Sequence, residues 1–165
     1  MALSAVLFLC AAKCFALPQA SSSIDLKAAR DFQEGRVADA ESALEAELRA
    51  HPQDLSALSL MAVILDSRRK YSEAEEFYRR ALQIAPGSPI ILNNLGNHYL
   101  ATGNLKKAEE SFRRVVAIDP HHVNANLQLA DMSVQRKDGA EALACLSRLA
   151  ATAQSQPVAQ SRQRL

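Results

Sequence analysis

Residues 89–120 read PIILNNLGNHYLATGNLKKAEESFRRVVAIDP and carry the strongest fold signal of the chain. Apolar residues recur every three or four positions in each half, which predicts two amphipathic helices. Ala101-Thr102-Gly103 predicts the turn between them, because glycine adopts turn conformations that other residues disfavour. Pro120 ends the second helix, since proline cannot continue one. The stretch therefore predicts a helical hairpin.

The hairpin recurs with a period of 34 residues, as the prolines Pro52, Pro86 and Pro120 show. Small residues let the two helices of a unit approach closely, and large ones fill the gap to the next unit. Four units are predicted, at 21–54, 55–88, 89–122 and 123–156, stacked over a continuous apolar interior. The other columns with this period are Ala40, Ala74, Ala108 and Ala142; Leu44, Tyr78, Phe112 and Leu146; and Ala28, Ala62, Gly96 and Ala130.

A known motif matches six residues of the first stretch: Leu95, Gly96, Tyr99, Ala108, Phe112 and Pro120. Their pattern resembles the tetratricopeptide repeat. Leu92 stands where the family has Trp, and Val115 where it has a small Ala. The resemblance covers residues 21–156. It implies an all-α, right-handed superhelical solenoid of four helix–turn–helix repeats that acts as a protein–protein interaction scaffold.

The resemblance also indicates a binding surface. In the family, the first helices line the inner face of the superhelix with the positions opposite their packing residues. A peptide segment of a protein partner is therefore expected to bind in this concave groove. The residues implied are Asn93, Asn94, Asn97, Asn124, Gln128, Asp131, Leu60 and Val63.

The amides of this set suggest how a peptide would be held. Asn and Gln offer both a donor and an acceptor, which suits a peptide backbone. Asn94 and Gln128 lie 34 residues apart and resemble successive rungs of the asparagine ladder of some peptide-binding members. Leu26 and Leu60 occupy the same column and do not fit it. The alternative is that the amides are simply solvated. The groove lacks the Lys and Arg of a carboxylate clamp, so chaperone C-terminal tails are not expected.

Charge and motif content exclude several functions. Nineteen Lys and Arg against 18 Asp and Glu give a net charge of +1, which argues against a nucleic-acid partner. The helical units contain no Gly-rich phosphate loop and no nucleophile elbow. No enzymatic activity, cofactor, metal or small-molecule substrate is expected, and His121-His122 is interpreted as a solvated turn. Four i,i+4 pairs predict a solvated outer face: Glu75–Arg79, Glu76–Arg80, Glu109–Arg113 and Glu110–Arg114.

Helix starts are marked by several polar residues. Asp54 and Ser88 predict N-caps of the first helices that follow them. Ser72 with Glu75 predicts a capping box at the start of a second helix.

The two end units depart from the repeat. Lys27, Asp31 and Glu47 replace apolar column residues in the first unit, which predicts a polar outer face. The fourth unit carries Leu143, Leu146 and Leu149 on its second helix, followed by a polar tail at 157–165. Either this outer face is open, which gives the alternative function of an assembly or oligomerisation element through self-association, or the tail folds back over it.

The N-terminal run ALSAVLFLCAA is too short to span a bilayer, which needs ~20 apolar residues. With Cys14-Phe15-Ala16 behind it, residues 1–20 predict a cleaved signal peptide and export to the periplasm or the medium. The alternative is an apolar helix that docks on the solenoid of a cytoplasmic protein. After cleavage Cys145 is the one cysteine left, and it is expected to be buried without a disulfide.

Overall fold

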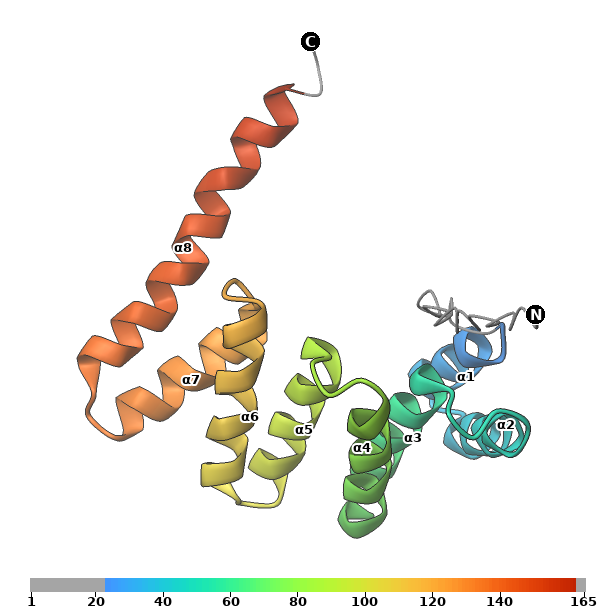
Figure 1. Cartoon of the computed structure of the whole chain (residues 1–165). Helices are drawn as coiled ribbons and strands as arrows, with labels where there is room; N and C mark the ends of the chain where they lie inside the picture. Colours follow the sequence, from blue (N-terminus) through green and yellow to red (C-terminus); the bar gives the residue numbers. More distant parts are fainter. Residues whose placement is uncertain (1–22, 163–165) are drawn as a thin grey trace, which may run out of the picture.

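The computed structural model describes residues 23–162, with side-chain surroundings for residues 24–150. This part of the chain is a row of helices without strands, stacked in sequence order (Figure 1). The helices are α1 (Ser23–Gln33), α2 (Val37–Ala50), α3 (Leu55–Ser67), α4 (Tyr71–Ile84), α5 (Pro89–Ala101), α6 (Leu105–Ile118), α7 (Val123–Gln135) and α8 (Gly139–Arg162). Consecutive helices pair as antiparallel hairpins, which confirms the predicted all-α repeat fold.

The four hairpin turns share one backbone conformation. Their left-handed residues are spaced by 34 along the chain: Gly35 (φ 79°), Arg69 (φ 60°), Gly103 (φ 76°) and Lys137 (φ 62°). After each of them a backbone N–H closes the turn; Asn104 N donates to Tyr99 O at 2.8 Å and Lys70 N to Leu65 O at 2.9 Å. Gly103 takes this conformation without strain, whereas the repeat geometry imposes it on Arg69 and Lys137.

Two of the predicted helix starts are confirmed, and the capping box is wrong. The Asp54 side chain accepts a hydrogen bond from Ala57 N at 2.9 Å, and Ser88 accepts one from Ile91 N at 3.5 Å. Helix α4 begins at Tyr71, so Ser72 lies inside its first turn, and Lys70 at the cap position makes no side-chain cap.

The small-residue column packs as predicted. Ala40, Ala74 and Ala108 are fully buried and Ala142 is 5% exposed, so the close approach of paired helices recurs in all four hairpins. Cys145 is also buried.

The predicted continuous interior consists of two clusters of buried residues that half-buried side chains connect. One runs from α1 to α5 and the other from α5 to α8, and the half-buried Leu82 and Tyr99 touch both.

The first unit corrects the expectation of a polar outer face. Lys27 is exposed, but Asp31 and Glu47 are only 4% and 5% exposed. Each has a partner from an adjoining turn: Arg36 Nε donates to Asp31 Oδ1 at 3.1 Å, and His51 Nδ1 lies 2.8 Å from Glu47 Oε1. These partners make burial of the carboxylates tolerable.

The outer-face ion pairs differ from the prediction in their partners. Arg113 pairs with Glu109 as expected, at 2.8 Å, whereas Arg79 pairs with Glu76 at i,i+3. The arginine that follows in each helix, Arg80 in α4 and Arg114 in α6, bonds to a backbone carbonyl instead. Arg80 donates to the Pro52 carbonyl at 3.1 Å and Arg114 to the Pro86 carbonyl at 3.0 Å, so each ties its helix to the turn before its own unit.

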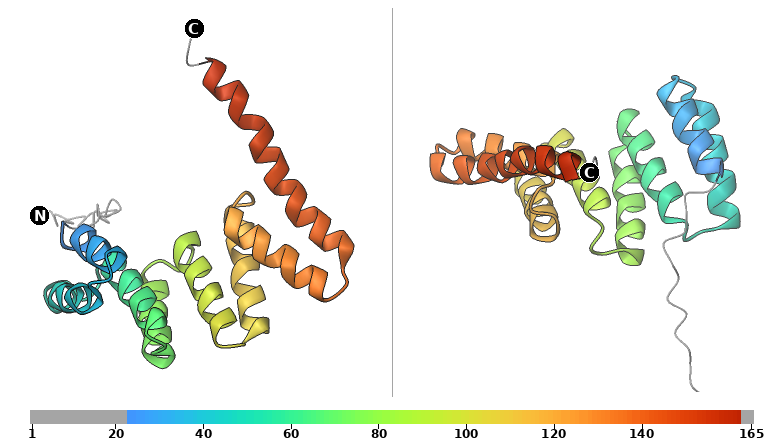
Figure 2. Two further views of the ribbon diagram at one scale, coloured as in Figure 1. Left: turned by 180° about the vertical axis from the view of Figure 1, so that it is seen from behind. Right: turned by 90° about the horizontal axis from the view of Figure 1, so that it is seen from above.

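Helix α8 is longer than the repeat requires. It runs for 24 residues to Arg162, so residues 157–162 continue the helix and do not fold back over the fourth unit. Figures 1 and 2 show its second half projecting beyond the other helices. The predicted signal peptide at 1–20 lies outside the described residues. None of the described helices is long and apolar enough to cross a membrane.

Candidate binding surface

Two adjoining cavities lie along the first helices and together form what we call the groove. The larger, of about 410 Å³, is mainly apolar, and we call it the apolar cavity. The smaller, of about 330 Å³, has more polar residues in its wall, among them Asp66, Asn97 and His98, and we call it the polar cavity. Val63 and Asn94 line both, so the groove is continuous from α1 to α5.

Exposed aliphatic side chains dominate the apolar cavity. Leu60 and Val63, both predicted site residues, are half-buried in its wall. Leu26 from α1 and Ile90 from α5 are 64% and 68% exposed, although both are aliphatic. Neighbouring apolar groups left facing water in this way favour an apolar ligand side chain.

The polar cavity contains a buried network that the sequence did not reveal. Asp66 Oδ2 accepts a hydrogen bond from the Tyr78 hydroxyl at 3.0 Å, and its Oδ1 lies 2.6 Å from His98 Nδ1. An ionised carboxylate can only accept hydrogen bonds, so Nδ1 of His98 carries the proton in this pair. The ring of His98 is 2% exposed and lies edge-on to three tyrosine rings: Tyr71, Tyr78 and Tyr99.

All three residues of the network line the polar cavity, but Asp66 is more exposed than Tyr78 and His98. The Asp66 side chain is 18% exposed and lines the polar cavity with Asn94 and Asn97. Burial, with the adjacent Asp66 carboxylate, raises the pKa of the Tyr78 hydroxyl above its usual value, so Tyr78 remains a donor. The network therefore holds one carboxylate in a defined orientation at the cavity wall.

The predicted amide residues of α5 and α7 have different surroundings in the structure. Asn94 and Asn97 line the groove, which places two of them beside Leu60 and Val63. Asn124 donates to Asn93 Oδ1 at 2.8 Å and to Asn97 Oδ1 at 3.4 Å, which joins α7 to α5. The amide oxygens of Asn93 and Asn97 are therefore already partly satisfied by Asn124.

The α7 residues of the predicted set lie apart from both cavities. Gln135 donates to Asp131 Oδ2 at 2.7 Å within α7, and Gln128 is half-buried on the same helix. Neither Asp131 nor Gln128 lines the groove described above. A ladder from Asn94 to Gln128 would need a ligand that continues past the polar cavity.

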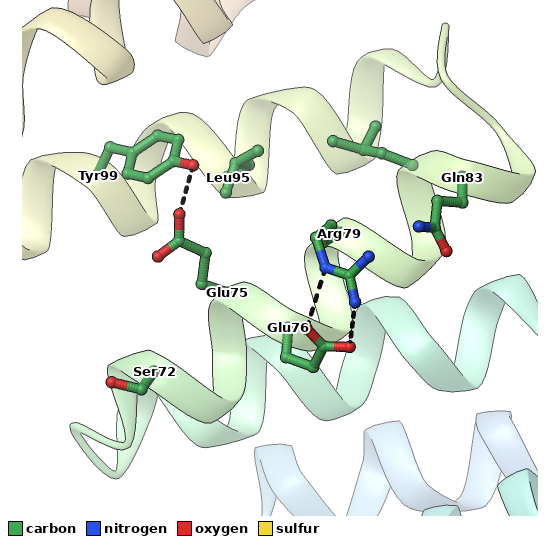
Figure 3. Close-up of a pocket in the computed structure, with 8 residues that line it drawn as sticks. Ser72, Glu75, Glu76, Arg79, Gln83, Leu95 and Tyr99 are labelled. Carbon is green, nitrogen blue, oxygen red and sulfur yellow. Dashed lines mark hydrogen bonds and ion pairs between the residues drawn. The ribbon is translucent and has the colours of Figure 1, made fainter.

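A third cavity of about 550 Å³, the outer cavity, lies between α4 and α5 (Figure 3). Two polar pairs stand in its wall: the Tyr99 hydroxyl donates to Glu75 Oε1 at 2.8 Å, and Arg79 Nε donates to Glu76 Oε2 at 3.0 Å. Lys107 also reaches Glu75 Oε1 at 3.4 Å. The outer cavity contains none of the predicted site residues.

The missed residues left little signal in the sequence. Asp66 and His98 are 32 positions apart, so the 34-residue period does not pair them. Ile64 and Met132 occupy the His98 column in the neighbouring units, and that change from apolar to polar was the one available hint. Across the described residues, no three His, Cys, Asp or Glu side chains come together as a metal site would require.

Stacked helical hairpins with a ligand-sized groove along their first helices define a helical-repeat scaffold. Residues 58–165 match the family model of the Cilia and flagella-associated protein 70 middle TPR-like domain, and residues 26–89 match the tetratricopeptide repeat model. The chain therefore belongs to the tetratricopeptide repeat family, whose members are generally non-catalytic scaffolds.

Individual proteins and solved structures are also similar to this chain. The Protein CTR9 homolog of Arabidopsis thaliana is 33% identical over 105 residues, which is 63% of this chain and 10% of that protein. The chain thus spans about a tenth of this relative. The crystal structure of MamA superposes with a TM-score of 0.71 at 16% identity, over 79% of each chain. The first TPR of Spaghetti (RPAP3) bound to the HSP90 peptide SRMEEVD superposes with a TM-score of 0.64 at 18% identity, over 69% of this chain and 90% of that one. These two structures share the fold.

Proposed function

We propose that this protein is a non-enzymatic scaffold that binds an extended peptide segment of a partner protein in the groove. The observation that carries the proposal is the continuity of the two cavities. Leu60 and Val63 offer apolar contact. Beside them, the side-chain amides of Asn94 and Asn97 each carry both a donor and an acceptor for a peptide backbone. The family likeness supports it, because the RPAP3 domain was solved with a peptide bound. Affinity should be modest, since a disordered peptide loses entropy on ordering.

The residues around the groove argue against a catalytic role. His98, which lines the polar cavity, is 2% exposed and held between Asp66 and tyrosine rings. A ligand in the groove would meet Asp66 and amides, and the partner is therefore expected to be a protein, not a nucleic acid or a small-molecule substrate.

The leader at 1–20 and export remain proposals, which N-terminal sequencing of the mature chain tests.

The groove can be tested with a random peptide library displayed on phage and selected on the full chain. Selected peptides should bind the Leu60→Glu variant at least tenfold more weakly, because a carboxylate would then occupy the apolar wall. Leu105→Glu is the matched control, since Leu105 is 53% exposed on α6 and does not line the groove. Helical circular dichroism should be the same for all three proteins. If every selected peptide binds Leu60→Glu as tightly as the wild type, the groove is not the binding site.

A second candidate function is assembly through the end face of the fourth unit. In the column Leu44, Tyr78, Phe112 and Leu146, the first three are at most 1% exposed because a following unit covers them. Leu146 is 44% exposed, and no further unit follows it among the described residues.

A second column supports the same interpretation; we call it the Glu75 column, and it holds Glu41, Glu75, Glu109 and Leu143. Each glutamate reaches the unit that follows: Glu41 pairs with Arg68, Glu75 accepts from Tyr99 at 2.8 Å, and Glu109 accepts from Arg136 at 2.6 Å. The last unit has Leu143 at this position, 70% exposed. The residue that links one unit to the next by polar bonds is thus replaced by an aliphatic one at the open end, which favours an apolar contact between copies.

A further inference from the structure

We propose that the groove selects a peptide in which a basic side chain lies next to an aliphatic one, with Asp66 as the recognition residue for the basic group. This inference rests on the proposed peptide-binding function and adds the class of ligand. It concerns Asp66, which belongs to no repeat column of acidic residues and was not among the predicted site residues.

The geometry of Asp66 suits recognition of a cation. Each carboxylate oxygen has room for two donors, and the structure supplies one to each: Tyr78 to Oδ2 and His98 to Oδ1. The side chain is 18% exposed at the wall of the polar cavity, so its remaining acceptor capacity faces a ligand. Because both partners come from helices packed against α3, the carboxylate is held in place before a ligand arrives, which lowers the entropy cost of binding.

The arrangement of the cavities sets the spacing of the two ligand side chains. Val63 belongs to both cavities, three residues before Asp66 on the same helix, and therefore one turn away. A peptide whose aliphatic side chain enters between Leu60 and Ile90 would bring one of its next residues over Asp66. Asn94 lies between the two positions and can hold the intervening peptide group.

The charge of the groove favours a basic ligand over an acidic one. Neither cavity is lined by a Lys or Arg among the described residues, and the carboxylates in their walls are Asp66 and Asp25. The imidazole of His98 also lies in the wall, where it is already bonded to Asp66 Oδ1. The arginine that begins the turn after α3, Arg68, is paired with Glu41 on the preceding unit. An acidic side chain over Asp66 would meet a like charge in a partly desolvated site, which disfavours it. This preference is opposite in sign to the acidic EEVD end of the peptide bound by the RPAP3 domain.

The first experiment is the sequence content of peptides selected from the random phage library on the full chain. We expect enrichment of Arg or Lys within two positions of Leu, Ile or Val, and depletion of Asp and Glu there. If Leu60→Glu weakens the binding of the selected peptides but the peptides show no such enrichment, the inference is overturned and the groove function stands. If Leu60→Glu does not weaken their binding, the groove function itself is overturned.

The second experiment is a double-mutant cycle between Asp66 and the ligand. A selected Arg peptide and its citrulline analogue, which keeps the shape and loses the charge, are titrated against wild type and Asp66→Asn by fluorescence anisotropy. Asp66→Asn should weaken the Arg peptide roughly tenfold, the size of one charge-assisted hydrogen bond, and leave the citrulline peptide nearly unchanged. Equal weakening of both peptides would show that Asp66 does not contact the basic group.

Two further variants separate recognition from stability. Glu73→Gln makes the same change of charge on the exposed outer side of α4 and should leave the affinity of both peptides unchanged. Asn97→Asp adds a second carboxylate at an exposed wall position of the polar cavity and should strengthen the Arg peptide severalfold relative to the citrulline peptide. If Asp66→Asn is partly unfolded by circular dichroism, Asn97→Asp alone decides the matter: no gain for the Arg peptide overturns the inference.

Discussion

At the scale of single residues, the contact between Gly96 and Phe112 sets the closest approach of paired helices in the third unit. A Cβ built on Gly96 would lie 2.6 Å from Phe112 Cε1 and 2.7 Å from its Cζ. Phe112 is fully buried, so its ring has no open space into which it could move. The neighbouring units tolerate Ala62 and Ala130 in this column, and Tyr78 and Leu146 stand where Phe112 does.

We therefore expect Gly96→Ala to destabilise the protein. Overpacking costs about 1–3 kcal/mol, and the better helix propensity of alanine returns at most ~1 kcal/mol. The urea midpoint should fall, with little change in the slope of the transition. Gly87→Ala is the matched control, because a Cβ at Gly87 meets nothing within 4 Å. A Gly96→Ala protein as stable as the wild type would mean that α5 and α6 can move apart without lowering the free energy of unfolding.

At the scale of the helices, a polar link joins α4 to the third unit. Glu75 on α4 accepts hydrogen bonds from Tyr99 on α5 at 2.8 Å and from Lys107 on α6 at 3.4 Å. The ammonium of Lys107 also lies 4.8 Å from the centroid of the Tyr99 ring. The hydrogen bond from Tyr99, aided by Lys107, lowers the pKa of Glu75 below its usual value. Three helices are thus joined through one carboxylate.

This linkage predicts a pH-dependent effect of Tyr99→Phe. Because the pKa of Glu75 is lower in the folded state, the bond stabilises the fold above the unfolded value of about 4.3 and is lost as the pH falls through the folded value. Tyr99→Phe should therefore lower the urea midpoint at pH 7 and make a smaller difference at pH 3.

The control for this prediction is Tyr71→Phe. Tyr71 lies at the same contact between α4 and the third unit, 6.0 Å from the His98 ring centroid, and no carboxylate is assigned to its hydroxyl among the described residues. Its effect on the midpoint should be the same at both pH values. A Tyr99→Phe effect that is independent of pH would show that Glu75 is not the group that titrates.

At the scale of the whole molecule, the two end faces of the stack differ. The first unit buries its charged column residues Asp31 and Glu47 against Arg36 and His51. The fourth unit leaves Leu143 and Leu146 in water, on a helix that runs on to Arg162. Side-by-side exposed leucines on a helix face favour association.

If this end face joins copies of the chain, light scattering should give a mass that rises above that of the monomer with concentration. Leu143→Glu restores the glutamate of the internal units, and with Leu146→Gln it should keep the protein monomeric without loss of helical circular dichroism. Leu105→Glu, at a position on α6 whose exposure of 53% lies between those of Leu143 and Leu146, should leave the association unchanged. A wild-type protein that stays monomeric at high concentration would remove the second candidate function.

The repeat architecture was determined by the sequence alone. Its 34-residue period predicts the hairpins, their buried alanine column and the turn at Gly103, because spacing along a helix sets which side chains share a face. The same reasoning placed Leu60, Val63, Asn94 and Asn97 along the first helices, where the structure shows two adjoining cavities.

The tertiary structure alone decided which polar groups meet. Asp66, Tyr78 and His98 come from three helices, and Glu75, Tyr99 and Lys107 from another three. Asn124, which has the same periodic signal as a groove residue, bonds to Asn93 and Asn97 on α5. Periodicity assigns a residue to a face of its own helix, but the partner across an interface depends on how neighbouring helices cross and on how far each side chain reaches. Both follow from how the helices pack against one another, and the residue pattern within one helix does not specify that packing.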